Sequence, residues 1–559
     1  MENLKWWQET LVYQIYPKSF MDTTGSGTGD LPGIIKKLDY LQSLGIGAIW
    51  LTPVYPSPMV DNGYDIAEYC SIDPVYGTMA DMEELIAEGR KRDIRIVMDL
   101  VFNHTSDRHR WFQESRQDRD NPQRDWYIWR DPRPDGSPPT NWRSIFGGSA
   151  WTLDRATGQY YLHTFAKEQP DLNWENPAVR QALYLAARFW LDKGVGGFRL
   201  DAITYIKKPG TFRDHPADGA DGLSSIHPIT ANSPGILDFL QEFRKAVFDG
   251  RDIFTVAEAN GVEPAELASW VGKHGAFDML FEFSHSQLGS GPQDLWCRPI
   301  KWQLTELKKA LADSQRATAQ NGWYPIFFEN HDLRRSVDHF FPVPVRDKQA
   351  AAKALAVILL TLRGTPFIYQ GEELGYENMR LSSIEAYDDI SSHGQYSQAL
   401  AEGFSPAEAL HFIQYFSRDN ARTPMQWNAE ENAGFTTGTP WLPVHPDYQR
   451  CNADRQAADP ASVLSWYHRL SWLRRQEPVL QKGSFAELLP REEALLGYDR
   501  ILGHQRIRVL VNFTENVVPI PAGLLDRGEF LLGSRGNAPG SEMRPLEACL
   551  YRLDEEAEP

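Results

Sequence analysis

The residues best suited to chemistry lie at the end of a short apolar run, residues 196–201 (Gly-Gly-Phe-Arg-Leu-Asp). Glycines, then bulky residues, then charges are typical of a buried parallel strand that emerges at its carboxyl end. Because side chains alternate along a strand, Arg199 and Asp201 share one face. The guanidinium favours the ionised form of Asp201, which a carboxylate nucleophile requires. For this hexapeptide alone, a structural ion pair is an equally good interpretation.

Three other predicted strands also end in reactive groups. One leads through Asp99 to His104, another ends at Glu258, and a third continues through Glu329 to Asp332. Gathering three carboxylates from different strands is electrostatically unfavourable, so packing alone would not select it. Glycoside cleavage needs such a set, because an ionised carboxylate attacks the anomeric carbon while a protonated acid assists the leaving oxygen.

The local sequence suggests a role for each carboxylate. Asp201 suits the nucleophile. Glu258 follows the apolar run 253–257, where loss of water and nearby carboxylates favour its protonated form, so it suits the acid/base. Asp332 would bind sugar hydroxyls and favour distortion towards the oxocarbenium-like state. All three are therefore predicted catalytic residues.

The elements that must position these residues alternate between apolar runs and amphipathic stretches, as in a parallel α/β fold. Helical spacing of apolar residues is clear from Leu31 to Leu41 and from Met82 to Ile86. Eight strands are predicted, the number that closes a (β/α)8 TIM barrel. The predicted strands are residues 11–16, 48–51, 94–101, 198–201, 253–257, 277–283, 325–328 and 366–369.

The interval between the third and fourth strands is about three times an ordinary βα unit. We expect residues 104–172 to form an inserted subdomain on the loop after strand 3. Residues 1–103 and 173–480 would form the catalytic barrel, with a helical cap near 377–416. The remaining stretch, 481–559, has short strands and Gly/Pro turns, which predict a C-terminal all-β sandwich domain.

Composition narrows the possible partners and location. A net charge of −18 repels phosphate backbones and anionic membranes, so neither nucleic acid nor a membrane is an expected partner. The four cysteines are far apart and form no CxxC pair, which fits a reducing cytoplasm. No secretion signal and no apolar run of bilayer length are visible. We expect a cytoplasmic monomer or small homo-oligomer.

The chain resembles the α-amylase superfamily of retaining glycosidases (glycoside hydrolase family 13), and within it the oligo-1,6-glucosidase and α-glucosidase branch. The resemblance covers nearly the whole chain and rests on motifs in the family's order. These are residues 61–65 (Asp-Asn-Gly-Tyr-Asp), 99–104, 169–173 (Gln-Pro-Asp-Leu-Asn), 197–201, the strand ending in Glu258, 330–332 and 417–427.

The resemblance implies the same three catalytic roles and adds a substrate pocket. The implied partner is a small-molecule gluco-oligosaccharide substrate. Asp61 and Arg418 would hold the far hydroxyls of its terminal glucose, closing the pocket so that cleavage proceeds from the non-reducing end. Tyr64 would stack beneath the ring. The other implied substrate-binding residues are His104, Phe146, Phe165, Gln169, Arg199, Ala202 and His331.

One departure concerns metal. Residues 22–30 (Asp-Thr-Thr-Gly-Ser-Gly-Thr-Gly-Asp) have the layout of the family's calcium loop, with oxygens at Asp22, Thr24, Ser26, Thr28 and Asp30. Relatives that bind calcium carry Asn and Asp at two of these positions, and losing a carboxylate weakens a hard-cation site. We therefore expect a loop held by its own hydrogen bonds, no required cofactor, and at most a weak structural calcium site.

A second departure concerns linkage. Members that prefer α-1,6 bonds typically carry Val after the nucleophile, where this chain has Ala202, and Glu258-Ala-Asn-Gly261 looks more like exo-α-1,4-glucosidases. We expect α-1,4 cleavage, with α-1,6 activity as an alternative.

Other activities of the family stay open as alternatives. Phosphotrehalases share the 22–30 loop but usually have Ala at the position of Pro170 and Val after the nucleophile. Sucrose isomerases and glucosyltransferases resemble the chain broadly, yet no Arg-Leu-Asp-Arg-Asp loop lies between Glu258 and His331, and Asn260 replaces an expected aromatic. A catalytically dead carbohydrate-binding protein is disfavoured because all three carboxylates are present.

Overall fold

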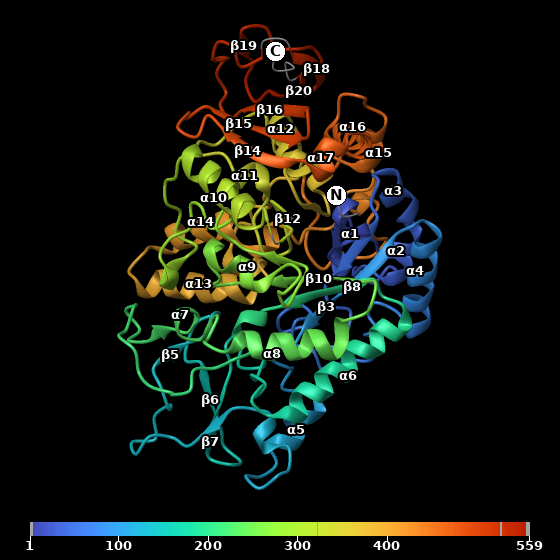
Figure 1. Ribbon diagram of the computed structural model, residues 1–559. Helices are drawn as coiled ribbons and strands as arrows, with labels where there is room; N and C mark the ends of the chain where they lie inside the picture. Colours follow the sequence, from blue (N-terminus) through green and yellow to red (C-terminus); the bar gives the residue numbers. More distant parts are fainter. Residues whose placement is uncertain (1–3, 321, 526–527, 555–559) are drawn as a thin grey trace.

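The computed structural model describes residues 4–320, 322–525 and 528–554. Its centre is a sheet of eight parallel strands in the order β11-β10-β8-β3-β2-β1-β13-β12. The outermost strands, β11 and β12, contact each other, so the sheet is a nearly closed barrel (Figure 1). The predicted (β/α)8 fold is confirmed. The strands are β1 (Val12–Ile15), β2 (Ala48–Leu51), β3 (Arg95–Val101), β8 (Gly197–Asp201), β10 (Phe254–Glu258), β11 (Met279–Phe281), β12 (Pro325–Ile326) and β13 (Thr365–Tyr369).

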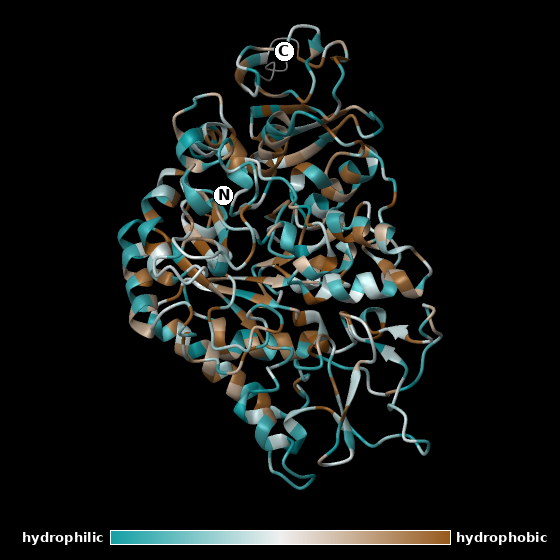
Figure 2. Ribbon diagram, turned by 180° about the vertical axis from the view of Figure 1, so that it is seen from behind, coloured by the Kyte–Doolittle hydropathy of each residue, from teal (hydrophilic) through white to brown (hydrophobic). Residues whose placement is uncertain are grey.

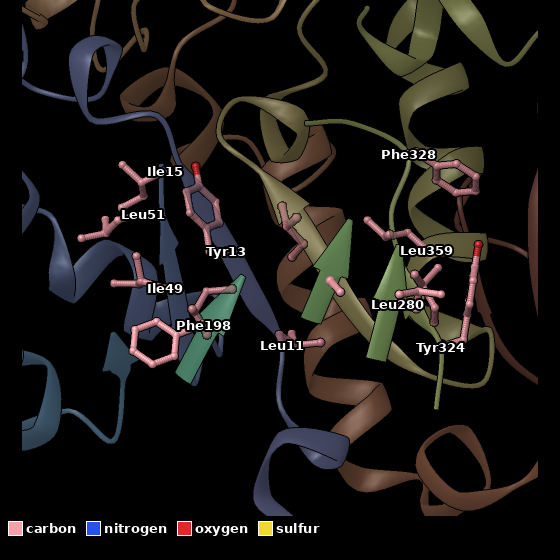
Figure 3. Packing of buried hydrophobic residues seen from close by; sticks show 14 of the residues in the cluster. Leu11, Tyr13, Ile15, Ile49, Leu51, Phe198, Leu280, Tyr324, Phe328 and Leu359 are labelled. Carbon is pink, nitrogen blue, oxygen red and sulfur yellow. The ribbon is translucent and has the colours of Figure 1, made fainter. Parts of the chain in front are cut away.

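Side chains along the strands alternate between two apolar layers. Tyr13, Ile49 and Phe198 belong to the large cluster shared with the surrounding helices (Figure 3). The intervening Val12 and Phe254 belong to a second cluster enclosed by the strands. A period of two therefore decides which side chains face the barrel axis.

Two glycines permit close strand approach where barrel strands begin. Gly197 has φ +155° at the start of β8, and a Cβ there would lie 2.0 Å from the carbonyl oxygen of Phe254. Gly364 has φ +142° just before β13, and its Cβ would lie 2.1 Å from the carbonyl oxygen of Tyr324. Any larger residue would push neighbouring strands apart.

Helices cover the outside of the barrel, and Figure 2 shows teal and brown residues mixed along them, as expected for helices with one buried face. The two predicted helical stretches are confirmed, the first as two short helices that meet at Lys37. Thr78 caps α4 and Asn176 caps α6. The principal helices are α2 (Leu31–Lys36), α3 (Leu38–Ser43), α4 (Met79–Lys91), α6 (Pro177–Lys193), α8 (Ile236–Phe243), α10 (Leu304–Ala317), α12 (Lys348–Thr361) and α16 (Val463–Gln476).

Residues 104–172 lie at one end of the molecule (Figure 1) and contain α5 (Arg110–Ser115) and a three-stranded sheet of β4 (Trp129–Arg130), β7 (Gln159–Leu162) and β6 (Trp151–Asp154). They are not structurally separate from the rest of the chain. β5 (Trp142–Arg143) pairs in parallel with β9 (Ser224–Ser225), which follows the fourth barrel strand. Arg143 also forms ion pairs with Asp218 and Asp221. The excursion after β8 therefore packs with the insertion after β3.

The C-terminal strands lie at the opposite end (Figure 1). They form a five-stranded antiparallel sheet in the order β14-β15-β16-β20-β18 and a two-stranded sheet of β17 and β19. One face of the larger sheet packs on the barrel side and the other contacts the smaller sheet, so the expected C-terminal antiparallel sheet domain is confirmed. The strands are β14 (Ser484–Leu488), β15 (Leu495–Leu502), β16 (Gln505–Asn512), β17 (Val518–Pro519), β18 (Gly528–Gly533), β19 (Glu542–Met543) and β20 (Ala548–Asp554).

Residues between the last barrel strand and the C-terminal sheet include two helices, α13 (Ile390–Ala401) and α14 (Pro406–Phe416), in the region expected to be a helical cap. The remaining helices are α1 (Trp6–Glu9), α7 (His227–Thr230), α9 (Leu267–Trp270), α11 (Ser336–His339), α15 (Ala453–Ala457) and α17 (Pro478–Lys482). Among the described residues, no helix combines the length and the apolar character that crossing a bilayer requires.

Candidate active site

Arg199 joins three carboxylates at the carboxyl ends of neighbouring strands. Its Nη1 lies 3.0 Å from Asp99 on β3 and 2.5 Å from Asp201 on β8, and its Nη2 lies 2.9 Å from Glu258 on β10. Asp99 and Arg199 are direct partners in the register of β3 and β8. The alternation that places Arg199 and Asp201 on one face thus directs this cluster to the barrel axis, as predicted.

The charge balance of this cluster differs from the expectation for Asp201. Burial raises the pKa of Asp201, and the charges of Glu258 and Asp99 raise it further against the opposing effect of Arg199. Since one guanidinium is shared among three carboxylates, it does not compensate all of them. The surroundings therefore raise the pKa of Asp201, whereas the sequence predicted that Arg199 would favour its ionised form.

The backbone after β8 helps to position Glu258. Ala202 has φ +45°, a left-handed conformation uncommon for a residue with a side chain. In this conformation its N–H donates to Glu258 Oε2 at 2.9 Å. The amide of Asn260 donates to Glu258 Oε1 at 3.1 Å. Glu258 is thus fixed by the residue that follows the neighbouring strand β8 and by a residue that follows its own strand β10.

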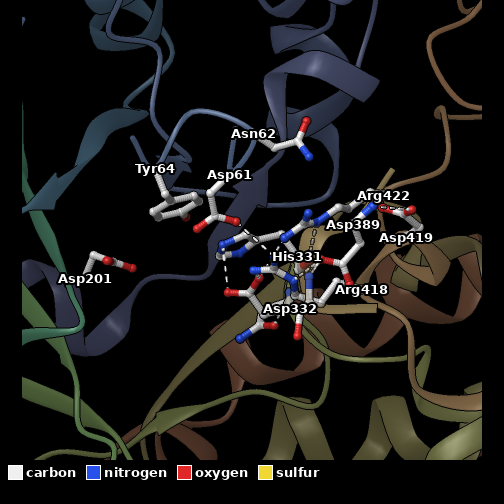
Figure 4. Close-up of polar contacts among 12 residues, drawn as sticks. Asp61, Asn62, Tyr64, Asp201, His331, Asp332, Asp389, Arg418, Asp419 and Arg422 are labelled. Carbon is white, nitrogen blue, oxygen red and sulfur yellow. Dashed lines mark hydrogen bonds and ion pairs between the residues drawn. The ribbon is translucent and has the colours of Figure 1, made fainter. Parts of the chain in front are cut away.

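Asp332 has a different environment, shown in Figure 4. Its Oδ1 lies 3.2 Å from Arg418 and 2.8 Å from Arg422, and its Oδ2 lies 3.0 Å from Nε2 of His331. Burial opposes ionisation, but His331, Arg418 and Arg422 outweigh it and hold the pKa of Asp332 well below its ordinary value. Asp332 is therefore a permanent negative charge at this position.

Arg418 extends this network to the side walls of the site. Its guanidinium lies 2.9 Å from Asp61 and 2.6 Å from Asp389 (Figure 4). Gln169 donates to the other oxygen of Asp61 at 3.1 Å. Two loops that are distant in the sequence are thereby joined across the site.

The aromatic residues form the remaining surface. Tyr64 stacks on His331 with ring centroids 5.1 Å apart and an interplanar angle of 8°, and its hydroxyl donates to Asp99 at 3.0 Å. Phe165 contacts both His104 and Phe146, with centroids 5.2 and 5.6 Å apart. These apolar surfaces face the same cavity as the carboxylates.

That cavity has a volume of about 550 Å³. Gln169, Arg199 and His331 do not line it, but each contacts a residue that does. All the other site residues predicted from the sequence line this one cavity: Asp61, Tyr64, His104, Phe146, Phe165, Asp201, Ala202, Glu258, Asp332 and Arg418. The structure therefore brings the predicted site together.

Several residues of the site were not predicted. Asp389 and Arg422 hold Arg418 and Asp332, and Tyr205, His227 and Arg334 line the cavity. The first two could have been suspected, because Arg422 lies in the motif 417–427 and Asp389 comes shortly before α13. Tyr205 lies in a short 3-10 helix after β8, His227 begins the short helix α7, and Arg334 follows the motif 330–332, but none of the three belongs to a motif itself.

The loop at residues 22–30 satisfies its carboxylates locally. Asp22 accepts hydrogen bonds from the backbone N–H groups of Thr24, Gly25 and Gly27 and from the hydroxyl of Thr436. Asp30 accepts from the N–H of Gly33 at 2.7 Å, capping α2. Within the described part of the chain, no group of three or more His, Cys, Asp or Glu side chains is arranged to hold a metal ion.

Comparisons with known proteins agree on one family. The model for the α-amylase catalytic domain matches residues 14–483. Oligo-1,6-glucosidase of Parageobacillus thermoglucosidasius is 44% identical over 98% of this chain and 99% of its own length. An α-glucosidase of Pediococcus pentosaceus is 43% identical over 98% and 99%. The crystal structure of isomaltulose synthase from Erwinia rhapontici NX5 is similar with a TM-score of 0.94 and 40% identity, covering 99% of this chain and 100% of that one. The chain therefore belongs to the α-amylase family and is a glycoside hydrolase.

Proposed function

We propose that this protein is a retaining, exo-acting α-glucosidase that releases terminal glucose from the non-reducing end of disaccharides and short oligosaccharides. The observation that carries the proposal is the shared cavity, which Asp201, Glu258 and Asp332 line together with Asp61 and Arg418. Carboxylates that flank one bound sugar are what double displacement requires.

In the proposed mechanism, Asp201 attacks the anomeric carbon while Glu258 gives its proton to the glycosidic oxygen. The glycosidic bond breaks, the leaving group departs as an alcohol, and glucose is held as an ester of Asp201. Water then attacks the same carbon, gives a proton to Glu258, and releases Asp201. Arg199 contacts both carboxyl groups and opposes the build-up of negative charge as the proton moves.

The charged network on the other side of the cavity supports recognition of a terminal sugar. Arg418 lies between Asp61 and Asp332, so donors and acceptors for sugar hydroxyls alternate along one wall. A chain that continued beyond the terminal glucose would have to pass this ion-paired wall. Cleavage of the outermost glucosidic bond follows from that arrangement.

We further infer a preference for α-1,4 bonds, because a small residue, Ala202, lies beside the bond to be cut and Asn260 contacts Glu258. Cleavage of α-1,6 bonds is the second candidate, favoured by the oligo-1,6-glucosidase relative. Rates on maltose and isomaltose distinguish the two. Sucrose, trehalose and trehalose 6-phosphate extend the comparison, and formation of a sucrose isomer without free glucose would indicate an isomerase.

The stereochemistry of release tests the mechanism. Two displacements restore the configuration, so the first glucose detected by NMR during maltose hydrolysis should be the α anomer. Initial release of β-glucose would contradict the proposal and indicate a single displacement by water. No release from any α-glucoside, including an aryl α-glucoside, would indicate a binding protein.

A further inference from the structure

We propose that Arg334 selects leaving groups that carry an anionic substituent, either a carboxylate or a phosphate. This inference rests on the proposed function, and it concerns the part of the cavity beyond the catalytic carboxylates. Arg334 lines the cavity that Glu258 and Asp332 also line. It follows β12 in the chain, whereas Glu258 ends β10, and β11 lies between these two strands where the barrel closes.

The Arg334 guanidinium has an unusually incomplete set of partners. The side chain is 3% exposed, yet its one hydrogen bond among the described residues is from Nη2 to the carbonyl oxygen of Leu288 at 3.0 Å. Nε is buried without a partner. The guanidinium instead lies over the rings of Tyr415 and Phe416, with its carbon 4.4 and 4.0 Å from their centroids. Buried polar groups that lack partners require an explanation, and a ligand is one.

Its charge is also uncompensated. Within the described residues, Arg334 forms no ion pair with a carboxylate at 4.0 Å or less. Asp338, the carboxylate whose charge acts on Arg334, is paired with Lys348 at 2.8 Å. Burial lowers the pKa of Arg334 to about 10, so the group is still protonated at neutral pH. An isolated buried cation of this kind favours an anion beside it.

Other buried arginines show what a purely structural role looks like in this molecule. Arg335 pairs with Glu329 at 2.8 Å. Arg474 and Arg500 have no carboxylate partner, but each donates to three or more carbonyl oxygens. Arg334 follows neither pattern, because it contacts the cavity and donates to a single carbonyl. Nε without a partner is also found in Arg335 and Arg474, so the feature particular to Arg334 is its Nη1, which has no hydrogen-bond partner among the described residues and is available to a substrate.

The surrounding polar groups fit a leaving group with hydroxyls as well. Leu288 accepts hydrogen bonds from Arg334 and from Nε2 of His339 at 3.0 Å, which leaves Nδ1 of His339 as an acceptor without a partner. His339 also lines the cavity. The Arg334 cation can bind the anionic substituent of a leaving group, and Nδ1 of the neighbouring His339 can accept a hydrogen bond from one of its hydroxyls.

The test compares substrates that differ in one charge. Maltobionate and maltitol are α-1,4-glucosides of open-chain partners that differ in a carboxylate, and trehalose 6-phosphate and trehalose differ in a phosphate. We expect kcat/KM for at least one anionic substrate, relative to its neutral partner, to fall about 10- to 100-fold in Arg334→Leu, the range for losing a charge-assisted hydrogen bond. The pair that responds identifies the anion. An unchanged ratio in both pairs overturns the proposal.

Controls separate charge selection from misfolding and from net charge. Arg334→Lys keeps the cation and should retain most of the ratio. Arg298→Leu removes an exposed arginine from the loop after β11 and should leave the ratio unchanged. If Arg334→Leu does not fold, the comparison of Arg334→Lys with Arg334→Gln decides the question in the same way.

The outcomes also distinguish this inference from the proposed function. Hydrolysis of an aryl α-glucoside by the wild type with no effect of Arg334→Leu on either ratio rejects only the role of Arg334. Absence of all α-glucoside hydrolysis in the wild type rejects the proposed function itself. Gluconate should inhibit aryl α-glucoside hydrolysis by the wild type more strongly than neutral sorbitol does, and Arg334→Leu should remove this difference. Equal inhibition of the wild type by the two compounds, together with unchanged substrate ratios, overturns the proposal.

Discussion

Two arginine-centred clusters line the same cavity with opposite charge balance. Arg199 is shared by three carboxylates, and the pKa of Asp201 is raised by burial and by its acidic neighbours. Around Arg418 and Arg422, cations are plentiful, and the pKa of Asp332 is held well below its ordinary value. A cavity of this kind can hold a mobile proton on one side and a permanent charge on the other.

Neighbouring carboxyls show that the balance of nearby charges, not contact with one guanidinium, decides the outcome, because Asp201 contacts Arg199 and its pKa is still raised. Asp389 contacts Arg418, which overcomes burial and lowers the Asp389 pKa to about 2. Asp419 accepts backbone hydrogen bonds from residues 388 and 389 instead, and burial raises its pKa to about 6. The two aspartates lie in one network (Figure 4) but differ in protonation behaviour.

The largest expected effect comes from removing the proposed nucleophile. Asp201→Asn should lower kcat on an aryl α-glucoside by roughly 10⁴-fold or more, because the amide cannot form the glycosyl ester. Thermal stability should be retained or improved, since the substitution removes a buried acid from the carboxylate-rich cluster. Turnover within tenfold of wild type would rule out the assignment.

Breaking the cation-rich cluster should affect both stability and binding. Arg418→Gln leaves Asp61, Asp332 and Asp389 less compensated, and removing one partner of a buried ion pair costs about 3–5 kcal/mol. We expect a lower midpoint of thermal unfolding and a raised KM. The matched control, Arg251→Gln, breaks the exposed pair with Asp192 and should cost no more than about 1 kcal/mol. Equal losses of thermal stability in the two variants would show that the buried ion pairs of Arg418 contribute no more than an exposed pair.

The dependence of stability on pH should separate the clusters. The pKa of Asp389 is lowered from 3.8 to about 2 in the folded protein. The ionised carboxylate therefore adds to the free energy of unfolding above pH 3.8, and this contribution is lost as the pH falls through 2. The contribution corresponds to roughly 2 kcal/mol. Asp201 has the opposite sign, since a raised pKa gives stability at low pH that is lost as the pH rises.

Unfolding free energies across pH check this prediction. The difference between wild type and Asp389→Asn should shrink by about 2 kcal/mol as the pH falls from 5 to 2. The Asp201→Asn variant should gain relative to wild type as the pH rises. Parallel curves for all three proteins would mean that the two clusters titrate alike.

A smaller effect is expected from Ala202→Val, which alters the residue joining the nucleophile strand to Glu258. The ratio of kcat/KM for isomaltose to that for maltose should rise. A β-branched residue at φ +45° is strained, so a stability loss of about 1 kcal/mol should accompany the change. An unchanged substrate ratio, measured on folded protein, would discredit the linkage inference.

The smallest effect is expected from chelation. The carboxylates of Asp22 and Asp30 are satisfied by N–H and O–H groups, unlike those of the arginine clusters, so no cation is needed to balance them. Excess EDTA should shift the midpoint of thermal unfolding by less than about 1 °C. A large downward shift that calcium reverses would show that the loop is an occupied metal site.

The sequence was sufficient for the barrel and for the residues at its strand ends. Arg199, Asp201 and Glu258 could be placed because alternation along a strand and convergence of parallel strand ends are general rules. The raised pKa of Asp201 could not be predicted, because it depends on one guanidinium meeting three carboxylates in space. Arg334 was missed for a related reason, since an unpaired cation is recognised only after every neighbour is known.

The pairing of β5 with β9, reinforced by Arg143, has a consequence for engineering. Exchanging residues 104–172 alone with those of a relative would remove β5 and Arg143. The segment near Ser224 would then lose its strand partner and its ion pairs. Chimeras should therefore transplant both segments together, and those carrying only one should express poorly or lose the shape of the entrance.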